Sequence, residues 1–139
     1  MQYKIGIRLK SAFRFWIYFA ANLYFRLLIV FFPFSKLKRS LAIAAGPDAD
    51  PSTARWVGRY VFHTAQYVPY STCVSRALTA HFFLRRKGLS SLIRVGVASK
   101  GNSVVAHAWV LSGSEVVVGN EAGELDEYAP IADMGTHHS

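Results

Sequence analysis

The one cysteine of this chain, Cys73, and a histidine further along it, His107, are the side chains best suited to covalent chemistry. Cys73 follows Ser71 and Thr72, either of which can cap a helix. We therefore expect its thiol at a helix N-terminus, where unpaired N–H groups and the helix dipole favour the thiolate. His107 falls in an expected strand, which would hold its imidazole rigidly as a general base. Together the two residues predict nucleophilic catalysis by cysteine, and the alternative interpretation is a small buried thiol with a core histidine.

A third residue is needed to orient the imidazole, and Asn120 is the first candidate. Asn120 ends the return strand of the hairpin that carries His107, so the two are expected side by side across the ladder. Glu121 and Asp126 are charged alternatives. Trp109 alternates onto the same strand face as His107, so we expect it to wall the site, contact substrate and exclude water.

An oxyanion hole is the next requirement, and the backbone N–H of Cys73 is its natural donor. Gln66, upstream of the thiol, is a candidate side-chain donor, although a helix-surface glutamine is the competing interpretation. His63, His81 and His107 do not show metal-ligand spacing and there is no second thiol, so we expect neither a metal nor another cofactor.

The elements that must position these residues form a helix followed by antiparallel strands. The helix begins near Ser71 or Thr72, carries an apolar stripe at helical spacing, and ends at Gly88. Strands are expected over 92–98, 103–111 and 115–118, and the acidic tail after Asn120 is expected to be irregular. In this arrangement the helix lies across the sheet, and the His107 face of the strand looks at Cys73.

Upstream, residues 3–32 are expected to form one long helix or a broken one. Further helices are expected over 34–45 and 51–66, the last one capped by Asp50. The break at 46–51 divides the chain into an apolar, basic N-terminal helical region, 1–46, and a catalytic domain, 47–139.

Composition bounds the partners and the compartment of the protein. The formal charge is +8, with 52% hydrophobic and 17% charged residues. No nucleic-acid-binding motif accompanies the basic residues, so no nucleic acid is expected. A single cysteine excludes an intrachain disulfide and fits a reducing compartment, which predicts the cytoplasm.

The apolar run from Phe13 to Phe34 raises the question of a membrane. Arg26 lies inside the run and would cost about 2.5–3.5 kcal/mol at the centre of a bilayer. We therefore favour a helix packed within the protein or against a partner, and keep peripheral membrane contact and a true span as alternatives.

Five short motifs follow one another between Cys73 and Ile131. They are Cys73-Val-Ser-Arg76-Ala77-Leu78, Leu84-Arg85-Arg86-Lys87-Gly88-Leu89, Ile93-Arg94-Val95-Gly96-Val97, Ala106-His107-Ala108-Trp109-Val110 and Tyr128-Ala-Pro130-Ile131. In series they resemble the lasso-peptide B2 proteins, the leader peptidases of lasso-peptide biosynthesis, and the C-terminal half of the fused B protein of the microcin J25 pathway. The resemblance covers about residues 50–131, and the N-terminal helices are also similar.

This resemblance implies an α+β fold of the transglutaminase-like, papain-type cysteine peptidase kind, with a helix packed on an antiparallel sheet. It implies that Cys73 is the nucleophile and His107 the base. The third member in this family is usually acidic, whereas the matching position here is Asn120. Papain-like enzymes use asparagine in that role, and Glu121 and Asp126 stay open.

The implied reaction is hydrolysis of one peptide bond in a ribosomal precursor peptide, which releases its leader. The implied partners are that precursor, a leader-binding B1 recognition-element protein and the separate lasso cyclase, which would use any ATP. Two other functions compete with this one. They are a transglutaminase-like amidase or acyl transferase, and a non-catalytic, membrane-associated binding module.

Overall fold

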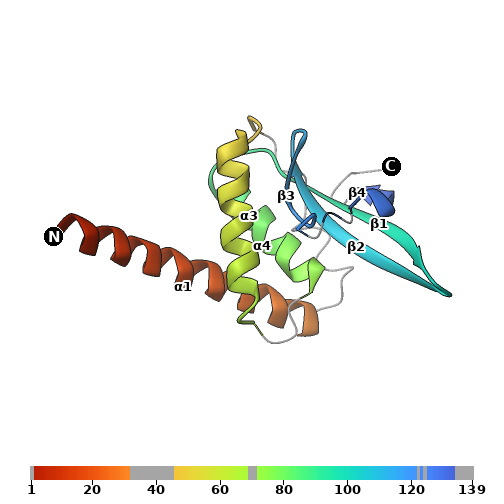
Figure 1. The fold of residues 1–139 in the computed structure, drawn as a ribbon, viewed down its shortest axis with the longest axis horizontal. Helices are drawn as coiled ribbons and strands as arrows, with labels where there is room; N and C mark the ends of the chain where they lie inside the picture. The colour runs from red at the N-terminus through yellow and green to blue at the C-terminus, as the bar shows by residue number, and fades with distance from the viewer. Residues whose placement is uncertain (1, 32–45, 69–71, 122, 124, 134–139) are drawn as a thin grey trace.

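A computed structural model describes residues 2–31, 46–68, 72–121, 123 and 125–133 (Figure 1). Within these described residues, three α-helices precede the strands, namely α1 (Gln2–Phe31), α3 (Pro51–Ala65) and α4 (Cys73–Arg86). The strands are β1 (Leu92–Lys100), β2 (Ser103–Ser112), β3 (Glu115–Val118) and β4 (Ala129–Asp133), with a short 3-10 helix at Leu125–Glu127. The helix expected over 34–45 lies outside the described residues.

The strands form one antiparallel sheet in the order β3-β2-β1-β4. Helices on an antiparallel sheet make this an α+β fold, which confirms the expected class. Strand β4 corrects the prediction that the tail after Asn120 is wholly irregular. Strand β4 contains Pro130 and lies at the edge of the sheet, where proline is tolerated.

The molecule is layered, with α3 and α4 between the sheet and α1 (Figure 1). Helix α4 packs on β2, α3 packs on β3, and α1 packs on both helices. The core between these layers is aliphatic, and its fully buried members include Val57, Val61, Leu84 and Val110. This core fixes α4 over the sheet, and therefore fixes where its N-terminus points.

The start of α4 is set by a capping box. The Thr72 hydroxyl accepts a hydrogen bond from the Ser75 N–H, and the Ser75 hydroxyl accepts one from the Thr72 N–H. Thr72, rather than Ser71, is therefore the cap, and Cys73 is the first helical residue. At the other end Gly88 has a φ of 72°, as expected for a residue that follows a helix.

Helix α3 shields the β3 edge of the sheet. A Cβ atom on Gly58 would collide with the carbonyl oxygen of Val117, so only glycine allows this approach of helix to strand. Asp50 caps α3 ahead of Pro51, as expected, although its carboxylate accepts from the Ser52 hydroxyl at 2.6 Å rather than from a helix amide. Hydrogen bonds from Ser52 and then Thr53 hold the pKa of Asp50 below its ordinary value.

Within α1, the segment Ala12–Phe31 is long and apolar enough to cross a membrane, but only 11% of its hydrophobic window is buried. One face packs on the protein through Tyr18 and Asn22, and most of the rest is exposed. The helix is thus neither a buried core helix nor detached from the fold.

Candidate active site

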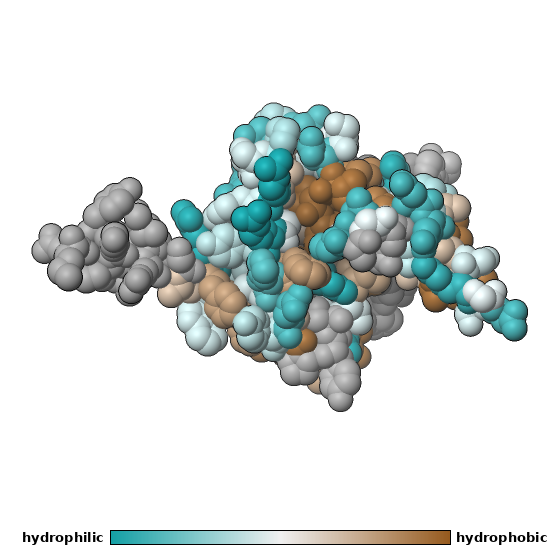
Figure 2. All heavy atoms as spheres, in the orientation of Figure 1, coloured by the Kyte–Doolittle hydropathy of each residue, from teal (hydrophilic) through white to brown (hydrophobic). Residues whose placement is uncertain are grey.

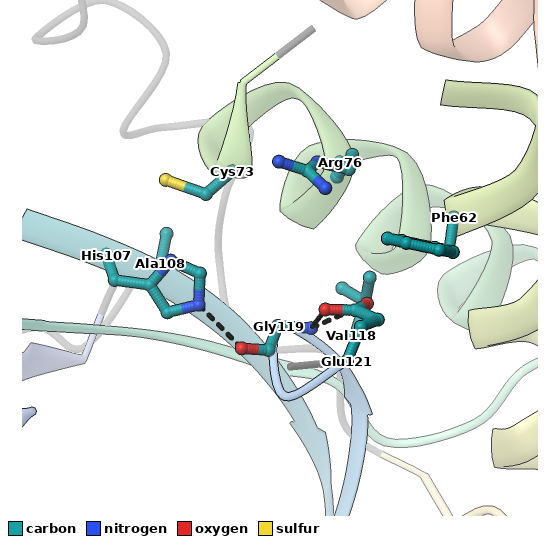
Figure 3. Close-up of a pocket in the computed structure, with 8 residues that line it drawn as sticks. All are labelled: Phe62, Cys73, Arg76, His107, Ala108, Val118, Gly119 and Glu121. Atoms are coloured by element: carbon teal, nitrogen blue, oxygen red, sulfur yellow. Dashed lines mark hydrogen bonds between the residues drawn. The ribbon is translucent and has the colours of Figure 1, made fainter. Parts of the chain in front are cut away.

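A pocket where α4 meets the sheet brings Cys73 and His107 together (Figure 3). Its volume is about 220 Å³. The remaining lining residues are Phe62 of α3, Arg76 of α4, Ala108 of β2 and Val118, Gly119 and Glu121 at the end of β3. Cysteine and histidine, distant in sequence, are therefore neighbours at one small cavity.

The thiol of Cys73 sits at the first position of α4 and is partly exposed. The amide groups of a first helical turn have no acceptor within the helix, so they face outward with the positive end of the dipole. Because the Ser75 amide is engaged by Thr72, the amide of Cys73 itself is the natural donor to an oxyanion formed at the thiol. Gln66 ends α3 on the surface and does not line this pocket.

A backbone carbonyl holds the imidazole of His107. Its Nε2 atom lies 2.6 Å from the carbonyl oxygen of Gly119. A carbonyl can only accept, so Nε2 carries the hydrogen and Nδ1 is left as the basic nitrogen of the neutral ring. The rings of Trp109 and Tyr128 flank the imidazole, with centroids 6.0 and 5.0 Å from it.

Gly119 occupies a position that only glycine fits. Its φ is 115°, and a Cβ atom there would collide with the Cβ of Trp109. The Glu121 carboxylate accepts from the Gly119 N–H at 3.0 and 3.1 Å. Glu121 therefore closes a tight turn that aims the Gly119 carbonyl at His107.

The three candidates for the orienting residue lie in different places. Asn120 is exposed, and its side-chain oxygen accepts from the Leu125 N–H at 3.1 Å instead of meeting His107. Glu121 lines the pocket and contacts His107 only through Gly119. Asp126 is exposed in the 3-10 helix and is not a lining residue.

Trp109 lies beside His107, as expected from strand alternation, but is only 3% exposed. It therefore offers its surface to the imidazole, and a contact with substrate would require the ring to be uncovered. The expectation that this strand face looks at the helix is corrected, because Ala108 and Val110 belong to the core under α4. The indole needs space that Gly96 provides, since a Cβ there would lie 2.7 Å from its ring.

A larger groove continues from the pocket along α3 and β3. It shares Phe62, Val118 and Glu121 with the pocket, and its volume is about 620 Å³. Arg55 and Arg59 line its α3 side. Figure 2 shows apolar atoms exposed in the hollow beside α3. The groove therefore adjoins the pocket that Cys73 lines.

Sequence reasoning missed the parts played by Gly119, Phe62 and Arg76 in this site. Arg76 had a usable signal, because it follows Cys73 by three residues and so shares its helix face. Phe62 had none without the packing of α3. Among the described residues, no group of three or more histidine, cysteine, aspartate or glutamate side chains is placed to hold a metal ion.

Comparison with known families gives a match over most of the chain. The family model of the transglutaminase-like superfamily matches residues 19–133, which include the second half of α1 and every strand. Searches of the curated proteins and of the solved structures gave no significant match.

Proposed function

The chain belongs to the transglutaminase-like superfamily, and we propose that it is a cysteine peptidase in which Cys73 and His107 cut one peptide bond of a ribosomal precursor. The observation that carries this proposal is their shared pocket, with the thiol at a helix N-terminus and the imidazole held by Gly119. The superfamily covers cysteine peptidases and acyl transferases, so thiol chemistry is the common ground.

In the proposed reaction Cys73 is the nucleophile and His107 the base. Nδ1 of His107 takes the thiol proton, and Sγ of Cys73 attacks the scissile carbonyl carbon. The oxyanion that forms is stabilised by the amide of Cys73 at the positive end of α4. Collapse breaks the C–N bond as the imidazolium gives its proton to the leaving amine. Water, deprotonated by His107, then cleaves the thioester and regenerates the thiol.

We assign the leader of a lasso-peptide precursor as the acyl side of this bond. The support is the series of motifs around Cys73 and His107, together with the groove of about 620 Å³ that adjoins the pocket. Arg55 and Arg59 would contact the bound chain, while the B1 recognition protein presents the leader. The freed core N-terminus would then pass to a separate cyclase.

Acyl transfer is the second candidate, because the same thioester is open to an amine as well as to water. Glutamine deamidation would use the same residues with a side-chain amide as substrate. Neither requires a change in the site, so the product decides between them.

Incubation of the full chain with its precursor and the B1 protein, followed by mass spectrometry, tests the proposal. We expect two peptides whose masses sum to that of the precursor plus one water, and none with Cys73→Ala. A precursor that keeps its length but shows the mass change of deamidation or amine incorporation would replace peptidase with transferase or amidase. An unmodified precursor with B1 present would overturn the proposal.

A further inference from the structure

The outward face of α1 is apolar and uncovered. Large side chains recur on it at intervals of three or four residues, which places them on one side of a helix. They are Phe13, Trp16, Ile17, Tyr24, Leu27 and Phe31, and their exposed fractions run from 39% to 75%. We call these six residues the outward face. An apolar surface of this length marks an interaction site rather than ordinary exposure.

The opposite side of α1 is committed to the protein. Asn22 is fully buried, and its amide donates to the Thr64 hydroxyl at 2.7 Å and to the Val61 carbonyl at 3.3 Å. Tyr18 stacks on Phe83 of α4 with ring centroids 3.8 Å apart. Crossing a bilayer would remove these partners from Asn22, so α1 is built to lie along the body of the protein.

The charge of the chain is concentrated at this end. All eight cations before residue 48 lack an acidic neighbour in sequence, because the first acid of the chain is Asp48. The remaining residues hold eight cations and eight acids, so their net charge is zero. The whole formal charge of +8 therefore belongs to α1 and the segment that follows it, not to the protein at large.

Together, the apolar outward face and the positive charge favour one kind of binding partner. A second copy of the chain would bring two such cationic segments together, which like charges oppose. Anionic lipid headgroups instead complement them, and each basic residue near such a surface strengthens binding. Trp16 and Tyr24 are also the residue types that prefer the headgroup level of a bilayer.

We propose that the outward face of α1 binds the surface of an anionic bilayer, with the helix parallel to the membrane plane. The six apolar side chains enter the boundary between headgroups and acyl chains, and the positive charge of the sequence before Asp48 attracts this end of the protein to the phosphates. Because α3 and α4 separate α1 from the sheet, the pocket of Cys73 stays away from the lipid (Figure 1). This binding is independent of the proposed peptidase activity.

Co-sedimentation of the full chain with vesicles tests the inference. We compare phosphatidylcholine alone with phosphatidylcholine that contains phosphatidylglycerol. Binding should be at least tenfold tighter to the anionic vesicles and should weaken as salt is raised. Equal binding to both compositions, or no binding to either, would overturn the proposal without any variant having to fold.

A pair of variants then locates the surface. Trp16→Glu combined with Tyr24→Glu should weaken anionic-vesicle binding at least tenfold, with an unchanged circular dichroism spectrum. Val104→Glu is the matched control, because Val104 is 73% exposed on β2 and away from α1. Binding lost equally in both variants, or retained in the double variant, would place the contact elsewhere.

Two further measurements distinguish binding to a membrane surface from dimerisation and from a membrane-spanning helix. Light scattering of the protein without vesicles should give a monomer, whereas a dimer broken by the double variant would assign the face to a second copy. The fluorescence difference between wild type and Trp16→Phe isolates Trp16. Its quenching should be strongest by bromines near the headgroups, and strongest quenching at the bilayer centre would indicate a spanning helix.

Discussion

The Nε2 atom of His107 lies 2.6 Å from the carbonyl oxygen of Gly119. A backbone carbonyl thus occupies the place of the acceptor side chain in a catalytic triad. It sets the imidazole tautomer and orientation as a carboxylate would, but it brings no negative charge to stabilise the imidazolium. With this orientation by main chain, the proposed catalysis would depend on the shape of the turn at Gly119.

Gly119→Ala is predicted to slow leader cleavage by roughly 10²-fold or more, since small misplacements of a catalytic group have effects of that order. The added Cβ would collide with Trp109, and the backbone would have to keep a φ of 115°, which alanine disfavours. Steady-state kinetics of precursor cleavage measure the loss. Gly123→Ala is the control, because Gly123 also has a positive φ (69°) but has open space around it. Equal losses in both variants would show that backbone strain, not the aim of the carbonyl, is responsible.

Cys73→Ala is predicted to abolish cleavage and leave the fold intact. The thiol is only partly buried, and the cap of α4 comes from Thr72 and Ser75, so little stability depends on sulfur. Mass spectrometry of the precursor and a thermal melt by circular dichroism measure the two effects. Val74→Ala, one residue along and outside the pocket, should keep the activity. Cleavage by Cys73→Ala at the wild-type rate would refute the catalytic assignment.

Glu121→Ala is predicted to reduce kcat, because the Gly119 amide loses its acceptor and the turn loosens. Glu121→Gln keeps one acceptor oxygen and should restore much of the rate. We expect the pH profile of kcat to shift in Glu121→Ala, since the imidazole it positions indirectly is less firmly held. A loss in Glu121→Gln as deep as in Glu121→Ala would mean that the charge, rather than the hydrogen bond, is required.

Asn120→Ala tests whether Asn120 acts through its contact with the Leu125 amide. Its side-chain oxygen holds the Leu125 amide, so its loss should slow cleavage by loosening the loop next to Gly119. Asn120→Asp keeps the acceptor and should retain activity if this contact is what matters. Equal rates for Asn120→Ala and wild type would show that the contact with Leu125 is not needed, and that the Gly119 carbonyl orients His107 without it.

Local signals predicted much of this fold, and long-range packing decided the rest. Thr72 and Gly88 mark the ends of α4 because capping chemistry is local. Strand β4 escaped detection because its pairing with β1 spans the whole hairpin, and Pro130 masks its pattern. Alternation along β2 grouped His107 with Trp109 correctly, but the face predicted to meet α4 was the wrong one, since Ala108 and Val110 lie in the core.

The candidate site shows the same division. Cys73 and His107 were found from residue type and local element, and the structure places both at one pocket. The acceptor at His107 was sought among side chains, whereas the contact observed comes from the main chain of Gly119. Every residue has a backbone carbonyl, so the sequence cannot indicate which carbonyl will contact the imidazole in the folded protein.

Asn22→Ala is predicted to destabilise the fold by about 1–3 kcal/mol, the usual result of leaving buried acceptors without a donor. The Asn22 amide joins α1 to Val61 and Thr64 of α3, and the Val61 carbonyl also accepts from the Thr64 hydroxyl at 3.3 Å, so the Thr64 oxygen is the acceptor that loses most. We expect a value towards the lower end, because the side-chain oxygen of Asn22 itself has no hydrogen-bond partner among the described residues. Urea unfolding followed by circular dichroism gives the free energy, and Asn102→Ala in the exposed β1–β2 turn is the control. If both variants unfold at the wild-type midpoint, α1 is not docked on α3 through Asn22.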